Sequence, residues 1–480
     1  MFSHIHKDKT KYDDLTRLPL MTVFLKNAED YFVTAYDKGT TPVMIFFDIN
    51  GIRPYIARHG VTEGDGLIKG FAELLRKYFG NEHCSRSDTF CFYAYTDIKG
   101  ADEFLPQLIK DMEFRSGGEK IAIRAGVFGG YSKDTDSMDS ACEKAVFACR
   151  NNKKSGISDI NYFDDRMDSE MKLRSFVAGN IDNAIKNGDI RLFYQTQVRL
   201  LNDKICGAEA LTRWEDPERG TLLPSVYIPI LEENNLTWKL DTFVIREVVR
   251  NIRRLKELGF KPLPVSLNLT YADFLVLNVP ETLSGIAKDN DIDPSLIVVE
   301  ITEKTILKNP DLMREEIEKL HDMKFRVLID DFGNGYSSLN MLNDFRFDAI
   351  KIDMDLMRSF TDRSRKIVES IIVMAKNLSI HTISEGVETR EHLEFLRSKG
   401  CEIVQGYYFG KLNSFDDTVR GYEENMTMER EDQEEGELFS KAGLINLMRS
   451  KAMCLTHFDG VRFDVFFANN EFYNLISRTG

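Results

Sequence analysis

The chain has 480 residues, about three times the roughly 150-residue size of a typical domain, so two or three domains are expected. Apolar residues make up 42% and charged residues 29%, an ordinary globular balance that excludes global disorder. With 63 basic and 77 acidic residues, the net charge is −14, which disfavours duplex nucleic acid as a partner. A small anionic ligand stays compatible with this charge, because metal ions or local arginines can reverse its sign in a pocket.

The sequence favours a cytoplasmic protein without a membrane segment. No run approaches the roughly 20 apolar residues of a membrane helix, and the N-terminus has no apolar stretch of signal-peptide length. The seven cysteines are scattered and have no CxxC spacing. They are therefore expected to be packed thiols in a reducing compartment.

The first predicted segment, residues 1–166, alternates loosely between strands and helices and is expected to form an α/β or α+β domain. Its expected strands are short apolar runs, and its expected helices carry apolar residues at helical spacing. The strands are predicted at 43–50, 89–97 and 120–131, and the helices at 66–79 and 139–156.

The second segment, residues 168–415, repeats a strand-then-helix pattern. Its strand-like runs are LFYQTQV, GAEALTRW, PVSLNLT, LIVVEITE, RVLIDDFG, AIKIDMD, HTISEGVE and EIVQGYYF. Eight runs in a segment of this size match a TIM-type (β/α)8 barrel, and continuous apolar runs indicate strands buried on both faces. A doubly wound open sheet is the alternative.

The end of the chain is expected to be less regular. Residues 416–437 contain the charge run EREDQEEGE and are predicted to be an acidic, solvated linker. Residues 438–480 form a short C-terminal extension, too small to bury a core alone. It is either part of a further domain or a segment packed on the barrel.

Acidic and polar residues lie at or near the ends of the predicted barrel strands. They are Glu209, Asn268, Glu300, Asp330, Asp331, Lys351, Glu385 and Glu388. In a barrel these positions converge on the carboxyl-terminal rim, where active sites of this fold are built. Any one of the acids alone would be explained by capping of the following helix.

So many carboxylates in one pocket require protons or cations. Two unit charges about 4 Å apart repel by about 4 kcal/mol at an effective dielectric constant near 20. Carboxylate and amide oxygens, without histidine or cysteine, indicate Mg²⁺ or Mn²⁺ rather than zinc. The adjacent pair Asp330 and Asp331 suits a two-metal phosphoester hydrolase. The following loop, DFGNGYSSL, is either a mobile loop over the site or an ordinary turn.

At this point the second segment resembles the EAL-domain cyclic di-GMP phosphodiesterases. The resemblance rests on the ordered motifs EALTRW, VSLNLT, EITE, DDFGNGYSSL, KID, EGVET and QGYYF. It implies hydrolysis of one phosphodiester of cyclic di-GMP to linear pGpG, by a metal-activated water and two ions per site. It also favours a homodimer formed through this domain. The implied metal ligands are Glu209, Asn268, Glu300, Asp330, Asp331 and Glu385.

The same resemblance assigns further roles. Lys351 would orient the water or stabilise developing charge, and Glu385 would be either a general base or a metal ligand. Glu388 and Gln405 match supporting positions in catalysis, and Glu303 matches the residue that holds the loop after Asp331. The expected substrate-binding residues are Gln195, Leu211 and Arg213.

Several positions depart from the family pattern without removing an expected ligand. They are Thr196, Asp216, Asn334 and Leu412.

The first segment resembles a degenerate GGDEF domain. DDLTRLPL, FFDINGIR and GVTEGD follow in the expected order, but the signature reads Arg86-Ser87-Asp88-Thr89-Phe90. Both glycines and the glutamate are replaced, and Ile56 and Ala57 stand where the family has Asn-Asp. Asp48 remains as one potential ligand. The resemblance therefore implies no diguanylate cyclase activity, and a regulatory or dimerising role.

Two other functions compete with the phosphodiesterase. The chain could be a catalytically idle cyclic di-GMP receptor, although receptors of that type usually lack metal ligands. It could also be a signalling scaffold, which would bind no nucleotide.

Overall fold

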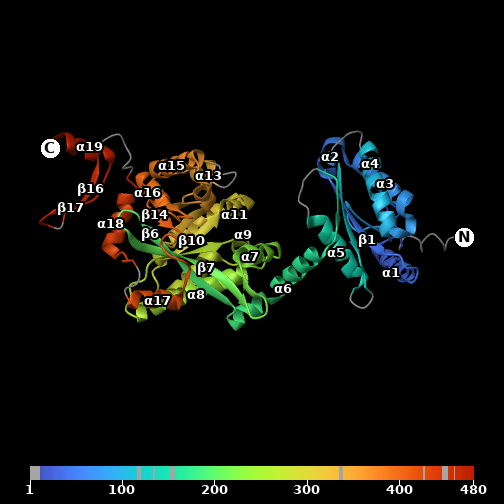
Figure 1. The fold of residues 1–480 in the computed structure, drawn as a ribbon, viewed down its shortest axis with the longest axis horizontal. Coiled ribbons are helices and arrows are strands. Elements are labelled where there is room, and N and C mark those ends of the chain that lie inside the picture. Colours follow the sequence, from blue (N-terminus) through green and yellow to red (C-terminus); the bar gives the residue numbers. More distant parts are fainter. Residues whose placement is uncertain are drawn as a thin grey trace. The chain divides into compact units, whose positions relative to one another are not determined.

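The computed structural model describes residues 11–115, 121–132, 136–151, 157–333, 339–424, 428–445, 452–458 and 460–479. The chain divides into two compact units between Ser175 and Phe176, within helix α6 (Asp165–Asn187) (Figure 1). None of the helices in the described residues is both long enough and apolar enough to cross a membrane.

The N-terminal unit is built on a five-stranded sheet with the order β2-β3-β1-β4-β5. The central strand β1 is antiparallel to both of its neighbours, whereas β4 and β5 are parallel. The strands are β1 (Pro42–Asn50), β2 (Cys84–Arg86), β3 (Cys91–Asp97), β4 (Ala122–Gly129) and β5 (Asp159–Tyr162). The helices are α1 (Met21–Asp37), α2 (Ile52–His59), α3 (Val61–Phe79), α4 (Ile98–Arg115) and α5 (Met138–Asn151).

Both faces of this sheet are buried. Along β1, Ile45 and Phe47 belong to one core cluster, and Met44 and Phe46 belong to another. This division follows from the alternation of side chains along a strand. Residues of α3 and α4 complete the first cluster, and residues of α1 and α5 complete the second. The apolar run at 43–50 is thus a strand covered on both sides, as the sequence indicates.

In the C-terminal unit, all eight predicted runs form strands of one closed sheet, which confirms the barrel (Figure 1). The open-sheet alternative is excluded by the pairing of β6 with β7, which closes the ring. The strands are β6 (Ile190–Arg199), β7 (Lys204–Asp216), β9 (Val265–Leu269), β10 (Ile297–Thr302), β11 (Arg326–Phe332), β12 (Ala349–Ile352), β13 (His381–Ser384) and β14 (Ile403–Gln405).

The first barrel strand differs from the expected repeat. Strand β6 is antiparallel to both β7 and β14, and no helix follows it. Only residues 200–203 connect β6 to β7, and Asp203 adopts a positive φ of 56° in this turn. A parallel crossover needs about a dozen residues or more. The short connection therefore forms a hairpin, and the prediction of a helix after the first run is wrong.

Helices surround the remaining strands and bury their apolar faces against the barrel. In α8, for example, Leu240, Val244 and Val248 recur at helical spacing and are buried. The helices are α7 (Pro224–Glu233), α8 (Thr237–Glu257), α9 (Tyr271–Val276), α10 (Val279–Asp289), α11 (Glu303–Lys308), α12 (Pro310–Asp322), α13 (Leu339–Asp344), α14 (Met354–Ser359), α15 (Asp362–Asn377), α16 (Arg390–Ser398) and α17 (Phe415–Glu423). Short strands β8 (Gly220–Leu222) and β15 (Asn413–Ser414) extend the sheet.

The segment after α17 is more ordered than the expected linker. Helix α18 (Gln433–Gly443) forms within it, and Glu431, just before this helix, is buried with a 5% exposed fraction. The prediction of a solvated acidic run is therefore wrong at Glu431, because a buried arginine, Arg199, pairs with it. Residues 452–458 and 460–479 contain strands β16 (Cys454–Phe458) and β17 (Phe463–Ala468) and helix α19 (Asn470–Thr479).

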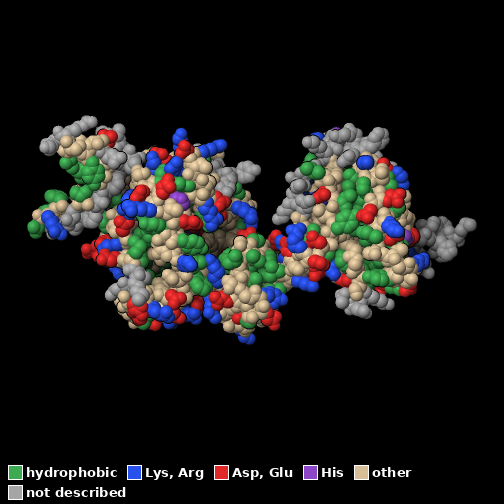
Figure 2. Space-filling view, viewed as in Figure 1, with side chains coloured by type: hydrophobic (Ala, Val, Ile, Leu, Met, Phe, Trp, Pro, Cys, Tyr) green, Lys and Arg blue, Asp and Glu red, His purple; other side chains and the backbone are tan. Residues whose placement is uncertain are grey.

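The surface of the barrel differs in composition from the surface near strands β16 and β17. Figure 2 shows acidic and basic side chains interspersed over the visible face of the barrel, and hydrophobic side chains gathered near β16 and β17. Val461 and Phe463 there are 89% and 68% exposed.

Candidate active site

The parallel strands bring most of the predicted polar residues to one end of the barrel. Asn268 lies near the end of β9, and Glu300 lies opposite it in register on β10. Asp330 occupies β11, Lys351 occupies β12, and Glu385 directly follows β13. Because parallel barrel strands all end at the same rim, side chains separated by more than 100 residues of sequence meet there.

Lys351 stands at the centre of this group. It is 1% exposed, and its ammonium contacts carboxylates from four other places in the barrel. The Nζ distances are 2.6 Å to Glu300 Oε2, 2.7 Å to Glu385 Oε1, 3.2 Å to Asp330 Oδ1 and 3.3 Å to Glu209 Oε1. Five residues predicted from the sequence thus lie in one cluster in the folded chain.

Glu209 is fixed by hydrogen bonds at both carboxylate oxygens. Asn268 Nδ2 donates to its Oε1 at 2.9 Å, and Gln405 Nε2 donates to its Oε2 at 2.5 Å. Gln405 also donates to Gln195 Oε1 at 2.8 Å and accepts from Gln197 Nε2 at 3.1 Å. These amides hold Glu209 in one orientation without adding charge.

Burial and mutual charge change the acidity of the cluster. Burial, together with the charge of Glu209, raises the pKa of Glu300 well above its usual range. Burial likewise raises the pKa of Glu385 to about 7. Burial opposes the charged form of Lys351, but the surrounding carboxylates outweigh it and raise the lysine's pKa. The cluster holds more negative charge than one ammonium neutralises, which favours uptake of protons or cations.

The donor set fits a hard divalent cation. Glu300 is fully buried, and its Oε1 atom has no hydrogen-bond partner in the described part of the chain. A buried carboxylate oxygen without a partner is costly unless a proton or cation meets it. Within the described residues, no group of three or more His, Cys, Asp or Glu side chains is already arranged as a metal site. The carboxylates instead direct oxygen atoms at Lys351.

Asp331 differs from its neighbour Asp330. It is exposed, and it is not among the carboxylates that contact Lys351. Its backbone has a positive φ of 56°, and the β11–β12 register shifts between Ile329 and Phe332. A non-glycine residue in this conformation carries backbone strain of the kind found at functional sites.

The other predicted residues differ in burial. Leu211 and Arg213 are half-buried on β7, on the same side as Glu209 by strand alternation. Arg213 Nη1 donates to the carbonyl of Thr212 at 2.7 Å. Glu303 is buried at the start of α11, and Glu388 is exposed. Residues 334–338 of the loop after Asp331, including Asn334, lie outside the described residues.

Gln197 is a site residue that the sequence reasoning missed. Its side chain is buried and donates to Gln405, which in turn holds Glu209. The available signal was its position two residues after Gln195, since side chains two apart on a strand share a face.

In the N-terminal unit, the residues of the expected degenerate signature lie at the end of β2, which includes Arg86, and in the turn that leads to β3. Arg86 Nη1 lies 3.4 Å from Asp13 Oδ1, and its Nη2 donates to the carbonyl of Thr89 at 3.0 Å. Asp48 on β1 forms an ion pair with Arg124 at 3.0 Å. The one acid expected to remain as a ligand is thus neutralised by an arginine.

Comparison with known proteins identifies the barrel. Residues 178–412 match the family model of the EAL domain, and this range contains all eight barrel strands. Residues 178–412 form an EAL domain. The Lys351 cluster therefore lies at the carboxyl-terminal end of an EAL barrel.

Relatives match beyond the EAL domain. Cyclic di-GMP phosphodiesterase NbdA of Pseudomonas aeruginosa is 26% identical over 434 residues, covering 87% of this chain and 55% of that protein. An uncharacterized signaling protein of Caulobacter vibrioides is 31% identical over 386 residues, covering 78% and 47%. The chain spans about half the length of these curated relatives. The solved structure described as PaMucR phosphodiesterase in complex with c-di-GMP has 28% identity and a TM-score of 0.48, covering 50% of this chain and 99% of that one.

Proposed function

We propose that this chain hydrolyses one phosphodiester bond of cyclic di-GMP and releases linear pGpG. The observation that carries the proposal is the cluster of carboxylates around Lys351 at the carboxyl end of an EAL barrel. The substrate class is supported by relatives named as cyclic di-GMP phosphodiesterases.

The reaction is proposed to depend on Mg²⁺ or Mn²⁺, with two ions per site. Bound there, the ions would supply Lewis acidity toward the phosphate and lower the pKa of the attacking water. The unpartnered Glu300 Oε1 supports this assignment, because a cation would satisfy it. The proposed ligands are Glu209, Asn268, Glu300, Asp330, Asp331 and Glu385.

The chain's own groups would position and neutralise the reactants. Lys351 holds carboxylates from separate strands in one place, and its ammonium can stabilise charge that develops on the phosphate. As the alternative to ligating a metal, Glu385, with a pKa of about 7, could accept the proton of the attacking water at a carboxylate oxygen. Gln405 keeps Glu209 oriented, and Glu303 and Glu388 keep their proposed supporting roles.

Substrate binding is assigned to the side of β7 that carries Glu209. Arg213 could hold a phosphate of the dinucleotide through paired charge-assisted hydrogen bonds. Leu211, between Glu209 and Arg213 on this side, and Gln195 opposite Glu209 on β6 would contact the substrate beside the cluster.

The N-terminal unit is proposed to be a GGDEF-like domain without cyclase activity, with a regulatory or dimerising role. This proposal is supported by the Asp48–Arg124 ion pair and by the presence of Arg86 at the end of β2. A homodimer through the EAL domain remains part of the proposal.

The deciding experiment is turnover of cyclic di-GMP with Mg²⁺ or Mn²⁺, followed by chromatography of the product. Glu209→Gln is the control, because it keeps the side-chain volume and removes the charge. We expect pGpG from the wild type and none from the variant. An intact substrate under conditions that support dimerisation would overturn the proposal. Retained nucleotide binding in that case would identify a receptor instead, and loss of all binding would favour a scaffold.

A further inference from the structure

A segment beyond the matched EAL range closes the opposite end of the barrel. Residues 428–445, called here the base segment, contain α18 and the strand-like residues before it. Arg430 forms a parallel bridge with Ile205, near the start of β7. The amide of Ile205 donates to Glu429 O at 2.8 Å, and the amide of Glu431 donates to Ile205 O at 2.9 Å. The base segment thus pairs with the barrel through its backbone.

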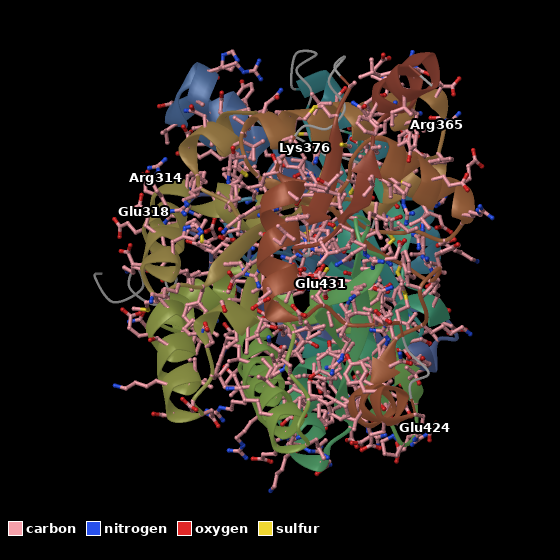
Figure 3. The ribbon with its side chains drawn as sticks, turned by 90° about the vertical axis from the view of Figure 1, so that its left-hand side faces the viewer. Arg314, Glu318, Arg365, Lys376, Glu424 and Glu431 are labelled. Atoms are coloured by element: carbon pink, nitrogen blue, oxygen red, sulfur yellow. The ribbon has the colours of Figure 1, made fainter. Side chains whose placement is uncertain are left out.

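Side chains fix α18 against the amino-terminal ends of the strands. Phe439 and Ala442 of α18 are buried. Lys376, in the last turn of α15, donates from Nζ to the carbonyl of Gly443 at 2.5 Å. Figure 3 shows α18 between the labelled Glu431 and Lys376, which lie near its two ends. Gly443 approaches Glu402 so closely that a Cβ atom would lie 2.3 Å from Glu402 Oε2.

A buried ion pair joins the base segment to strand β6. Arg199 Nε lies 2.5 Å from Glu431 Oε1, and Arg199 Nη2 lies 3.3 Å from Oε2. Asn202 Nδ2 also donates to Glu431 Oε1 at 2.8 Å. The side chains of Arg199 and Glu431 are only 8% and 3% exposed. Loss of one partner would leave an uncompensated buried charge, so the pair constrains the end of β6.

Strand β6 continues this contact toward the catalytic cluster. Arg199, Gln197 and Gln195 alternate along the strand and therefore share its inward side. The β6–β14 register is regular here, pairing Gln405 with Gln197 and Ile403 with Arg199. Gln197 donates to Gln405 at 3.1 Å, and Gln405 donates to Glu209 at 2.5 Å. Buried polar side chains thus lie along the barrel between Glu431 and Glu209, with one set of hydrogen bonds from Arg199 to Glu431 and another from Gln197 through Gln405 to Glu209.

We propose that the base segment positions Glu209 from the far end of the barrel, and that Arg199, Glu431 and Gln197 are positioning residues of the cation site. The Glu431–Arg199 ion pair fixes the position of β6. Strand β6 in turn fixes the positions of the side-chain amides that orient the Glu209 carboxylate. The inference rests on the proposed function only in taking Glu209 as a metal ligand. Of these residues, Glu431 lies outside the matched EAL range 178–412, whereas Gln197 and Arg199 lie inside it.

The test measures Mn²⁺ affinity of the full chain by titration without substrate, with turnover and the midpoint of thermal unfolding as further readouts. Glu431→Gln should weaken Mn²⁺ binding about tenfold or more, as loss of outer partners of metal ligands does. The matched control is Glu435→Gln in the same segment, where Glu435 contacts Lys204 at 2.6 Å and is 30% exposed. This control should bind Mn²⁺ within twofold of the wild type.

Two further variants separate positioning from stability. Gln197→Met keeps the side-chain length and removes the donor to Gln405, so Mn²⁺ affinity should fall while the unfolding midpoint changes little. The double variant Arg199→Gln with Glu431→Gln removes both charges and should recover affinity relative to Glu431→Gln alone. Where Glu431→Gln does not fold, Gln197→Met carries the test.

Unchanged Mn²⁺ affinity in Gln197→Met, or equal losses in Glu431→Gln and Glu435→Gln, would overturn the positioning role. A wild type that binds Mn²⁺ without hydrolysing cyclic di-GMP would overturn the phosphodiesterase alone. In that outcome the affinity comparison between the variants still decides the role of the base segment.

Discussion

At the scale of single residues, the ammonium of Lys351 partly neutralises the negative charge of the carboxylates in the site. It lies within 3.3 Å of carboxylates from Glu209, Glu300, Asp330 and Glu385. A buried ammonium with several anionic partners offsets the desolvation cost that each carboxylate would otherwise carry. In the proposed reaction the same ammonium would also stabilise charge on the substrate phosphate.

Replacing Lys351 by methionine should therefore reduce both activity and stability. We expect turnover of cyclic di-GMP to fall at least 100-fold, because a preorganised charge is lost. In metal-free buffer the free energy of unfolding should fall by about 3–5 kcal/mol, because buried carboxylates lose their partner. Urea denaturation and product chromatography measure the two effects.

The control for Lys351→Met is Lys399→Met. Lys399 forms a surface ion pair with Glu369 at 2.9 Å, outside the cluster. Surface pairs contribute about 0–1 kcal/mol, so this variant should keep nearly wild-type turnover. Equal activity losses in the two variants would contradict the assigned role of Lys351.

A second buried carboxyl pair lies on α8 and α9, beside β9. Asp241 and Asp273 hydrogen bond to each other, and Asp273 accepts from Thr270 N at 2.6 Å. Burial, together with the neighbouring Asp273, raises the pKa of Asp241 well above its usual range. Asp241 Oδ2 and Asp273 Oδ1 have no partner among the described residues unless a proton lies between the carboxyl groups. One shared proton would satisfy both oxygens.

This pair predicts a pH dependence of stability. The folded state holds the proton of Asp241 more tightly than the unfolded state does. The stabilisation is therefore complete below about pH 4 and decreases as the pH rises toward the folded-state pKa. Asp241→Asn supplies a permanent donor, so it should raise the free energy of unfolding at pH 8 by about 1 kcal/mol. It should also flatten the slope between pH 4 and 8, measured by denaturant titration.

Asp182→Asn provides the comparison, because Asp182 is 70% exposed and pairs with Lys239 at the surface. Its pH slope should match that of the wild type. An unchanged or steeper slope in Asp241→Asn would show that the folded protein does not hold the proton of Asp241 more tightly than the unfolded chain does.

At the scale of elements, the packing of α18 depends on a glycine near its end. A Cβ atom at Gly443 would lie 2.3 Å from Glu402 Oε2, and Glu402 is buried and bonded to His381 at 2.6 Å. Gly436 in the same helix faces only Glu431 Oε2, at 3.6 Å. The same substitution should therefore have opposite effects at the two positions.

Gly443→Ala should lower the free energy of unfolding by about 1–3 kcal/mol, because overpacking displaces Glu402 or α18. Gly436→Ala should raise it by about 0.5–1 kcal/mol, because alanine favours the helix. Thermal or urea unfolding of both variants measures the difference. Two variants of equal stability would show that α18 does not approach Glu402 in solution.

At the scale of the whole molecule, the two units differ in the charged residues that they bring together. The N-terminal unit keeps one expected acid, Asp48, and pairs it with Arg124. The cluster around Lys351 is formed entirely by residues of the C-terminal unit. The proposed roles of the two units can therefore be tested separately.

If the N-terminal unit is GGDEF-like, as proposed, the full chain with GTP and Mg²⁺ should form no cyclic di-GMP, because residues 86–90 lack the glycines and the glutamate of that signature. Asp48→Asn should leave cyclic di-GMP hydrolysis within twofold of the wild type, since Asp48 contributes nothing to the Lys351 cluster. Chromatography of the nucleotides measures both reactions. Production of cyclic di-GMP from GTP would refute the assignment of the N-terminal unit.

The sequence by itself was sufficient for the eight barrel strands and for most of the cluster. Apolar runs of strand length and acids at their ends are local properties, and a closed barrel brings such ends to one rim. Glu300, Asp330, Lys351 and Glu385 could thus be predicted together. The position of each residue within its strand was sufficient for this prediction, because the neighbouring apolar residues of the strand are buried in the barrel.

The tertiary structure determined features of the fold that the local sequence pattern does not specify. The direction of β6 depended on a connection too short for a crossover, and this direction put Gln197 beside Gln405. The burial of Glu431 depended on Arg199, more than 200 residues away along the chain. The charged side chains of an acidic run stay in solvent unless a residue distant in sequence forms an ion pair with them. Only the folded chain brings that residue into contact.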